Sequence, residues 1–138
     1  MSNVALAERV GLSPAPCLRR VRALEQGGVI KKYVTLINPA AVDLAVSVWT
    51  KVRLDLQVAR RFSFFEQNIF RWREVPECYL MAGEADYLVR VVVPSVFAYE
   101  KFLTGFLSRT DGVVGTNSSF VLKVVKQNTA LPLNLHPG

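Results

Sequence analysis

Residues 13–22 include the side-chain types that read a nucleic acid duplex. Ser13 and Pro14 favour a helix start, because serine can accept hydrogen bonds from free N–H groups of the first turn and proline needs no bond there. At about 100° per residue, Arg19 points away from the apolar stripe of this helix, with Arg20 and Arg22 on its flanks. An outward arginine can bind guanine, and flanking arginines can pair with phosphates. The alternative is an ordinary amphipathic helix with a basic surface.

A second segment, residues 83–87, has the composition of a small-molecule site. Gly83 lets the backbone approach a ligand, Asp86 can pair with an ammonium group, and N–H groups of the turn can hold a carboxylate. Hydroxyls of Thr116, Ser118 and Ser119 enter a later strand. A tight β-turn with an aspartate side-chain hydrogen bond is the alternative. The candidate effector-binding residues are Gly83, Ala85, Asp86, Tyr87, Thr116 and Ser118.

The residues needed for catalysis or for holding a metal do not form a recognisable set. Cys17, Cys78 and His136 are too few for an ordinary zinc site, and we expect two reduced, buried thiols and a mobile histidine in the tail. Glu74 and Glu77 are more typical of a solvated strand entrance than of an acid/base pair. Nucleophile elbows, phosphate loops and dinucleotide fingerprints are missing from the sequence. We therefore expect no enzyme activity, no metal and no cofactor.

Composition and charge divide the chain into unlike parts. Of its 138 residues, 51% are hydrophobic and 20% charged, which is typical of a globular protein. No apolar run is long enough to span a bilayer and no signal peptide is evident, so a cytoplasmic location is expected. Residues 1–61 contain ten Lys/Arg and four Asp/Glu, whereas residues 62–138 contain seven of each. The net charge of +6 thus belongs to the first part, which favours a polyanionic partner there, although a solvated basic surface is the alternative.

The N-terminal part is predicted to form a helix-turn-helix. Residues 4–10 carry apolar residues at helical spacing, and Gly11 ends that helix. The second helix runs from Ser13-Pro14 to Gly27-Gly28. Its apolar stripe consists of Cys17, Leu18, Val21 and Leu24. Residues 29–37 are read as a strand or an extended connector whose basic edge, Lys31 and Lys32, is a further candidate contact to DNA.

The remaining elements alternate in the order βαββαβ, which predicts a ferredoxin-like sandwich. The expected spans are strand 45–56, helix 57–70, strand 75–81, strand 87–93, helix 95–108 and strand 116–126. Val58, Phe62, Phe65 and Ile69 form the apolar face of the first of these helices. Residues 83–86 and 112–115 are expected to be turns, and Asn38-Pro39 marks the domain boundary near residues 38–43.

Taken together, these segments resemble the Lrp/AsnC family of transcriptional regulators. Residues 6–17, 20–25 and 28–30 are similar to the second and third helices of its DNA-binding domain, and residues 83–88, 116–123 and 125–133 are similar to its sensing domain and usual ending. The resemblance implies an α+β chain. The implied parts are a partial winged helix-turn-helix module (1–38), an amino-acid-sensing and oligomerisation domain of RAM type (44–128) and a tail (129–138).

The resemblance also implies partners. Family members form dimers through the βαββαβ domain and assemble further, often to octamers. Many bind a free amino acid near the Gly-x-x-Asp-Tyr turn, between dimers, which changes assembly or DNA affinity. Carried over to this chain, Ser13, Pro16, Arg19 and Arg20 are the implied operator contacts.

One departure from the family pattern concerns the first helix. Family members begin with a further helix under the helix-turn-helix, and this chain starts after the place where that helix ends. Val4, Leu6, Val21 and Leu24 are therefore expected to lack a packing partner. A misplaced start or truncation is one explanation. A natural member with a weakened reader is the other, and it supports an alternative function as an amino-acid-binding assembly module without DNA binding.

Overall fold

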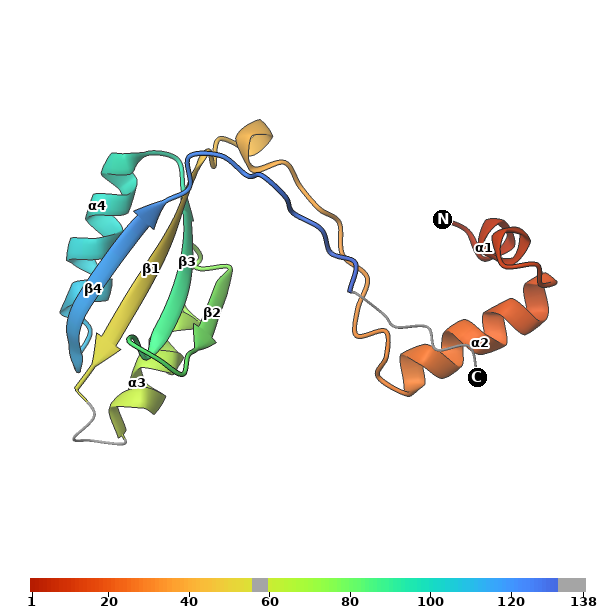
Figure 1. Ribbon diagram of the computed structural model, residues 1–138, viewed down its shortest axis with the longest axis horizontal. Coiled ribbons are helices and arrows are strands. Elements are labelled where there is room, and N and C mark those ends of the chain that lie inside the picture. Colours follow the sequence, from red (N-terminus) through yellow and green to blue (C-terminus); the bar gives the residue numbers. More distant parts are fainter. Residues whose placement is uncertain (56–59, 132–138) are drawn as a thin grey trace. The chain divides into compact units, whose positions relative to one another are not determined.

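The computed structural model describes residues 1–55 and 60–131, and for Arg60 and Arg61 the backbone alone. Contacts divide the chain into two compact units, Met1–Ile37 and Asn38–Gly138 (Figure 1). Val58 and His136, both named in the sequence analysis, lie outside the described residues. No helix in the described part of the chain is long and apolar enough to cross a membrane.

The first unit is a pair of helices, α1 (Asn3–Arg9) and α2 (Pro14–Gln26). Gly11 makes the turn between them with a φ of 65°, in the left-handed region where glycine carries no Cβ penalty. Asn3 Nδ2 donates to the carbonyl of Pro14 at 2.8 Å and so joins the two helix starts. The helix-turn-helix expected from the sequence is present.

Two details of this unit differ from the sequence-based expectation. Ser13 precedes α2 with extended backbone, but its side chain makes no capping hydrogen bond. Cys17 is the buried residue of the expected apolar stripe, whereas Leu18 and Leu24 remain 38% and 43% exposed because α1 covers a narrower part of α2 than the stripe spans. Val4 is exposed as well, as expected, and Leu6 and Val21 are half-buried.

The sequence predicted either a strand or an extended connector for residues 29–37. The structure shows an extended connector after α2 and no strand. Gly28 has a φ of 72°, and the Ile30 N–H donates to the Leu24 carbonyl where the helix ends. Tyr33 Oη donates to Glu25 Oε1 at 2.7 Å, which fastens the connector to the end of α2. A short 3₁₀ helix, η1 (Pro39–Val42), opens the second unit.

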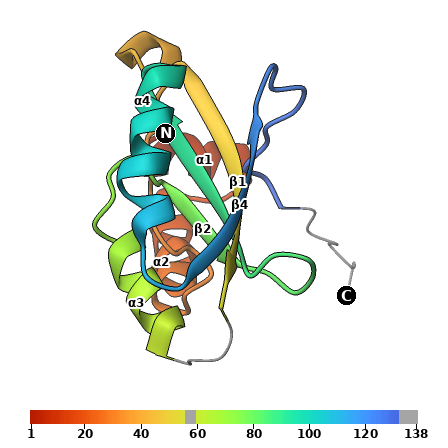
Figure 2. The same ribbon diagram turned by 90° about the vertical axis from the view of Figure 1, so that its left-hand side faces the viewer.

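The second unit is a four-stranded antiparallel sheet with α3 (Arg60–Ile69) and α4 (Val96–Gly105) on one face (Figure 2). The strands are β1 (Val46–Leu54), β2 (Glu77–Leu80), β3 (Tyr87–Val93) and β4 (Val113–Phe120). Their order in the sheet is β2-β3-β1-β4, as in the ferredoxin-like fold, and a 3₁₀ helix η2 (Leu107–Arg109) follows α4. The predicted βαββαβ architecture is confirmed.

Strict alternation along β1 and β3 separates the two faces of this sheet. Buried side chains point to the helices from every second residue of β1 and β3, and the core also includes Phe65 of α3 and Phe102 of α4. The β1 and β3 members of this core are Val48, Val52, Leu54, Tyr87, Val89, Val91 and Val93. We call the opposite side, which carries Ser47, Trp49, Lys51 and Arg53 of β1, the outer face.

The last strand lies earlier in the sequence than predicted. Gly112–Gly115 was expected to be a turn and residues 116–126 a strand, but β4 begins at Val113 and ends at Phe120. Gly115 lies in the sheet opposite Arg53 in the regular register, and the register with β1 shifts only beyond it, between Arg53 and Leu54, where Val114 is the extra residue. Residues 121–126 leave the sheet, and Leu122 is 97% exposed.

Candidate functional site

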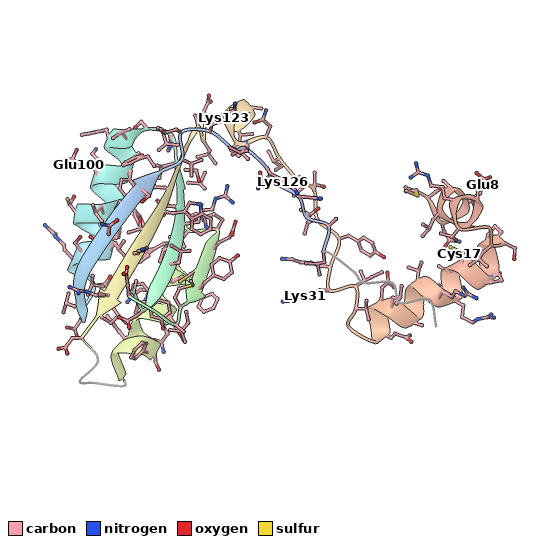
Figure 3. The ribbon with its side chains drawn as sticks, viewed as in Figure 1. Glu8, Cys17, Lys31, Glu100, Lys123 and Lys126 are labelled. Atoms are coloured by element: carbon pink, nitrogen blue, oxygen red, sulfur yellow. The ribbon has the colours of Figure 1, made fainter. Side chains whose placement is uncertain are left out.

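The outward side of α2 carries a shallow, basic groove. It has a volume of about 380 Å³ and is lined by Ala15, Leu18, Arg19, Arg22, Ala23 and Gln26. Cys17 lies on the opposite side of the helix, between α1 and α2, which fixes the outward direction (Figure 3). The structure therefore brings Arg19 and Arg22 together on one exposed surface with two small alanines, a shape that can approach a base edge.

The other residues selected as DNA contacts do not line this groove. Ser13, Arg20, Lys31 and Lys32 are exposed, and Pro16 is half-buried. Gln26 and Leu18 belong to the groove but were not selected. The 100° helical angle places Gln26 almost in line with Arg19, so this signal was available in the sequence.

The excess of positive charge is shared between the two units. Residues 1–37 contain six Lys/Arg and two Asp/Glu, a net charge of +4, and the remaining +2 lies beyond residue 37. Lys51 and Arg53, which were counted with the basic first part, belong to the sheet. The sequence division at residue 61 was therefore wrong for these cations, because the unit boundary lies more than twenty residues earlier.

The turn between β2 and β3 is held by three hydrogen bonds to Asp86. Its Oδ2 accepts from the Leu54 N–H at 2.7 Å, its N–H donates to the Val52 carbonyl at 3.0 Å, and its carbonyl accepts from the Met81 N–H at 2.8 Å. Gly83 has a φ of 149°, a backbone conformation that favours glycine. Asp86 thus ties this turn to the end of β1.

A cavity of about 580 Å³ lies beside this turn. Its lining is Lys51 and Arg53 of β1, Glu84 and Ala85 of the turn, and Gly115, Thr116 and Asn117 of β4. Lys51 Nζ and Glu84 Oε2 are 3.7 Å apart. The cavity therefore offers two cationic groups and one carboxylate within a small volume, an arrangement that suits a zwitterionic ligand.

Four of the six effector candidates lie at this turn and cavity or form part of it. Ala85 and Thr116 line the cavity, and Gly83 and Asp86 belong to the turn beside it. Lys51, Arg53, Glu84 and Asn117 were not selected. The alternation of β1 indicates that Lys51 and Arg53 share one face of the sheet. The sequence does not show which turn lies beside that face.

Tyr87 and Ser118 lie on the helix side of the sheet. Tyr87 is 2% exposed, packs on Phe65 with ring centroids 4.7 Å apart, and donates from its hydroxyl to Glu66 Oε1 at 2.7 Å. Burial, together with that hydrogen bond, raises the pKa of Tyr87. The Ser118 hydroxyl is hydrogen bonded to the Tyr99 hydroxyl, which lies 2.8 Å from Thr50 Oγ1. Side-chain contact of either residue with a ligand in the cavity is therefore contradicted by the sheet's alternation.

The outer face carries a second polar and aromatic cluster, near β2. Arg90 Nη1 lies 2.6 Å from Glu77 Oε1, and the Arg90 guanidinium lies 6.0 Å from the centre of the Trp49 ring. Tyr79 stacks near Trp49 and donates to Glu77 Oε2 at 2.9 Å. Glu77 therefore belongs to an ion pair, not to an acid/base pair with Glu74. A groove of about 790 Å³ runs from this cluster to residues 121–127.

Both units match known protein families. Residues 47–131 match the Lrp/AsnC ligand-binding domain, and residues 1–31 match a winged helix-turn-helix DNA-binding domain. The chain belongs to the Lrp/AsnC family. The leucine-responsive regulatory protein of Escherichia coli K12 is 40% identical over 131 residues, which cover 95% of this chain and 80% of that protein.

Solved structures of Lrp/AsnC regulators have the same fold. A transcriptional regulator of Neisseria meningitidis in complex with L-methionine is 37% identical with a TM-score of 0.94, over 97% of this chain and 86% of that one. The feast or famine regulatory protein of Mycobacterium tuberculosis, also in complex with L-methionine, is 32% identical with a TM-score of 0.79, over 94% and 86%.

Membership in the Lrp/AsnC family shows the general function of the chain. It is a transcriptional regulator with a helix-turn-helix unit for DNA and a ligand-binding domain for an amino acid, and it is not an enzyme. In the described residues, no three His, Cys, Asp or Glu side chains are grouped to hold a metal ion.

Proposed function

We propose that a free amino acid, bound at the cavity beside the β2–β3 turn, controls how this regulator assembles and binds its operator. One observation carries the proposal. A single chain joins a helix-turn-helix unit of net charge +4 to a sheet whose glycine turn borders a cavity with both cationic and anionic groups. The L-methionine complexes of two relatives support an amino acid as the ligand class.

Arg19 is the proposed base-reading residue. It lines the exposed groove of α2, opposite the buried Cys17, and its guanidinium can donate two hydrogen bonds to guanine. The other exposed cations of this unit are assigned to phosphates: Arg22 lines the groove beside Arg19, and Arg20, Lys31 and Lys32 lie outside its lining. The assigned phosphate contacts are Arg20, Arg22, Lys31 and Lys32, with Ser13 and Pro16 at the helix start nearest the duplex.

The effector site is assigned to the turn and the cavity together. Gly83 and Ala85 present backbone to the ligand, and Thr116 lines the cavity from β4, with its side chain on the helix side like that of its partner Val52. Asp86 is assigned a positioning role and no direct contact with the ligand. Its carboxylate already accepts a hydrogen bond from the Leu54 N–H and thereby holds the turn against β1. Tyr87 and Ser118 are assigned an indirect role: their contacts on the helix side stabilise the sheet that carries the site.

Assembly is assigned to the sheet unit, residues 44–128, with the tail 129–138 following it. The outer face carries the half-buried Trp49, the exposed Tyr79 and a long groove, and a second copy of the chain is its proposed occupant in a homodimer. Dimers then associate further, to an octamer in the family pattern. Operator binding places the regulator in the cytoplasm.

The decisive experiment is a DNA-binding titration against the promoter of the chain's own gene at two salt concentrations. Wild type is expected to prefer the promoter to unrelated DNA, and Arg19→Ala is expected to lose that preference, at a cost of about 1–3 kcal/mol. Arg22→Ala is expected to weaken binding to all sequences and reduce the salt slope by about 1.

Arg109→Ala is the matched control, because it removes the same charge from the other unit. Sedimentation of each variant reports assembly. Loss of assembly in Arg19→Ala would contradict the division of labour between the units. If wild type shows neither promoter preference nor salt-dependent binding to any DNA, the chain is an amino-acid-binding assembly module instead.

A further inference from the structure

We infer that the cavity between β1, β4 and the β2–β3 turn is built for an acidic amino acid, aspartate or glutamate. This inference rests on the proposed amino-acid sensing and specifies its ligand. The cavity lining contains two cations and one anion, so it can match the two carboxylates and the single ammonium group of such a ligand.

The two cations come from neighbouring positions on one face of β1. Lys51 and Arg53 are separated by the buried Val52, so both side chains leave the outer face of the sheet. Their backbone positions are about 7 Å apart at a strand rise of about 3.4 Å per residue. Two cations at this spacing can each take a different carboxylate of one small ligand.

Arg53 is held over β4 by the absence of a side chain at Gly115. A Cβ built at Gly115 would lie 3.4 Å from Arg53 Nη2 and 3.5 Å from Arg53 Nε. The guanidinium therefore lies across the strand and borders the cavity. A glycine at this point of β4 leaves the room that a planar carboxylate group needs beside the sheet, so that its two oxygens can accept hydrogen bonds from the Arg53 guanidinium.

Glu84 supplies the complementary charge from the turn. Its carboxylate lies 3.7 Å from Lys51 Nζ, and the two side chains are 92% and 56% exposed. An exposed ion pair of this kind contributes little to stability, so a ligand can replace it at small cost. The ligand's ammonium group would then face Glu84 while one of its carboxylates faces Lys51.

The rest of the lining favours a polar ligand side chain over an apolar one. The described residues of the lining are Lys51, Arg53, Glu84, Ala85, Gly115, Thr116 and Asn117, and none of them is a large apolar residue. A ligand with an apolar side chain would gain little from burial here, since that gain depends on apolar area removed from water. A second carboxylate would gain a charge-assisted hydrogen bond.

Calorimetric titration of the full chain with glutamate, glutamine, aspartate, asparagine and methionine tests this inference. Each acid and its amide have nearly the same shape and differ by one charge. Wild type is expected to bind the better acid at least 10-fold more tightly than its amide. Arg53→Gln and Lys51→Gln are each expected to reduce that ratio to below 3-fold. Lys101→Gln, on the exposed side of α4, removes the same charge and should leave the ratio unchanged.

Gly115→Val is a second variant, which keeps every charge but displaces the Arg53 guanidinium. It is expected to reduce the ratio as Arg53→Gln does, and a melting curve verifies that each variant is folded. Equal binding of an acid and its amide by wild type, or a ratio that survives in the folded variants, would overturn the inference.

Three further outcomes separate this inference from the proposed function. Methionine binding without any preference for the acids leaves amino-acid sensing intact and overturns the acidic specificity. If none of the amino acids binds, amino-acid sensing fails and the inference fails with it. Binding of the dicarboxylate 2-oxoglutarate as tightly as glutamate would overturn the pairing of an ammonium group with Glu84.

Discussion

Replacement of Asp86 by alanine should destabilise the sheet unit as well as disturb ligand response. The Asp86 carboxylate accepts the Leu54 N–H at 2.7 Å, and Leu54 is only 4% exposed. Alanine at this position leaves that backbone donor without its partner, at the point where β1 ends and the register with β4 shifts. An amide that loses its acceptor in such surroundings has poor access to water as a substitute.

The expected size of the effect follows from this single bond. A hydrogen bond to a charged group contributes about 1.5–3 kcal/mol, so Asp86→Ala should lower the free energy of unfolding by about that amount. For a unit of roughly 100 residues, this corresponds to a fall in Tm of roughly 6–24 °C. Asp86→Asn keeps a carbonyl acceptor and should lose about half as much or less.

Fluorescence-monitored denaturation measures this effect, because both tryptophans, Trp49 and Trp72, lie in the sheet unit. All variants are compared at one protein concentration, since assembly shifts apparent stability. An Asp86→Ala variant within about 0.5 kcal/mol of wild type would refute the structural role of the carboxylate. If that stable variant also loses its amino-acid response, direct ligand contact by Asp86 is the better explanation.

Three other predictions concern the core, a thiol and the helix-turn-helix. Tyr99→Phe removes a hydroxyl that is hydrogen bonded to the fully buried Thr50, and it should lower the free energy of unfolding by about 1–3 kcal/mol in denaturant titrations. The double variant Tyr99→Phe/Thr50→Val should lose less stability than the sum of the two single variants. Additive losses would disprove the coupling between the two hydroxyls. Burial, followed by the nearby Glu66 carboxylate, raises the pKa of Cys78 to about 11. The neutral Cys78 thiol therefore contributes its full stabilisation below about pH 9, and this contribution is lost as the pH rises through about 11. Alkylation of Cys78 at pH 8, followed by peptide mass mapping, should be roughly 100-fold slower in the folded protein than in the unfolded chain. Equal alkylation rates would contradict this prediction. Gly11→Ala forces alanine into a φ of 65° and should cost the helix-turn-helix about 1–2 kcal/mol, seen as faster amide exchange in α1 with the sheet unchanged; unchanged exchange in α1 would show that the turn adapts.

The elements that the sequence predicted well are those with a strong local period. The β3 strand was predicted at its observed bounds because a continuous apolar run ends at Pro94, and β1 alternates without a break. The two helices of the first unit were recognisable because Gly11 and Gly27 lie where each helix ends. Periodicity and chain breakers are local properties, so the sequence states them directly.

The missed features depend on which segments lie together in space. Gly115 looks like part of a turn in sequence and becomes a strand residue because β1 offers it a partner opposite Arg53. The hydrogen bond from Leu54 to Asp86 joins residues 32 positions apart. Tyr87 was selected as a ligand contact on its neighbourhood in the sequence, whereas the alternation of β3 turns its ring into the core. A pattern of residue types does not specify such pairings.

Alternation along β1 also separates the residues of the proposed effector site from the residues that pack against the helices. The side chains that hold α3 and α4 occupy the even positions 48 to 54, and the side chains that face the outer cavity and groove occupy the odd positions between them. A substitution at 51 or 53 therefore alters the charge offered to a ligand while the packing against the helices is untouched. A library restricted to the odd positions of this one strand is expected to sample new effector preferences among proteins that nearly all fold.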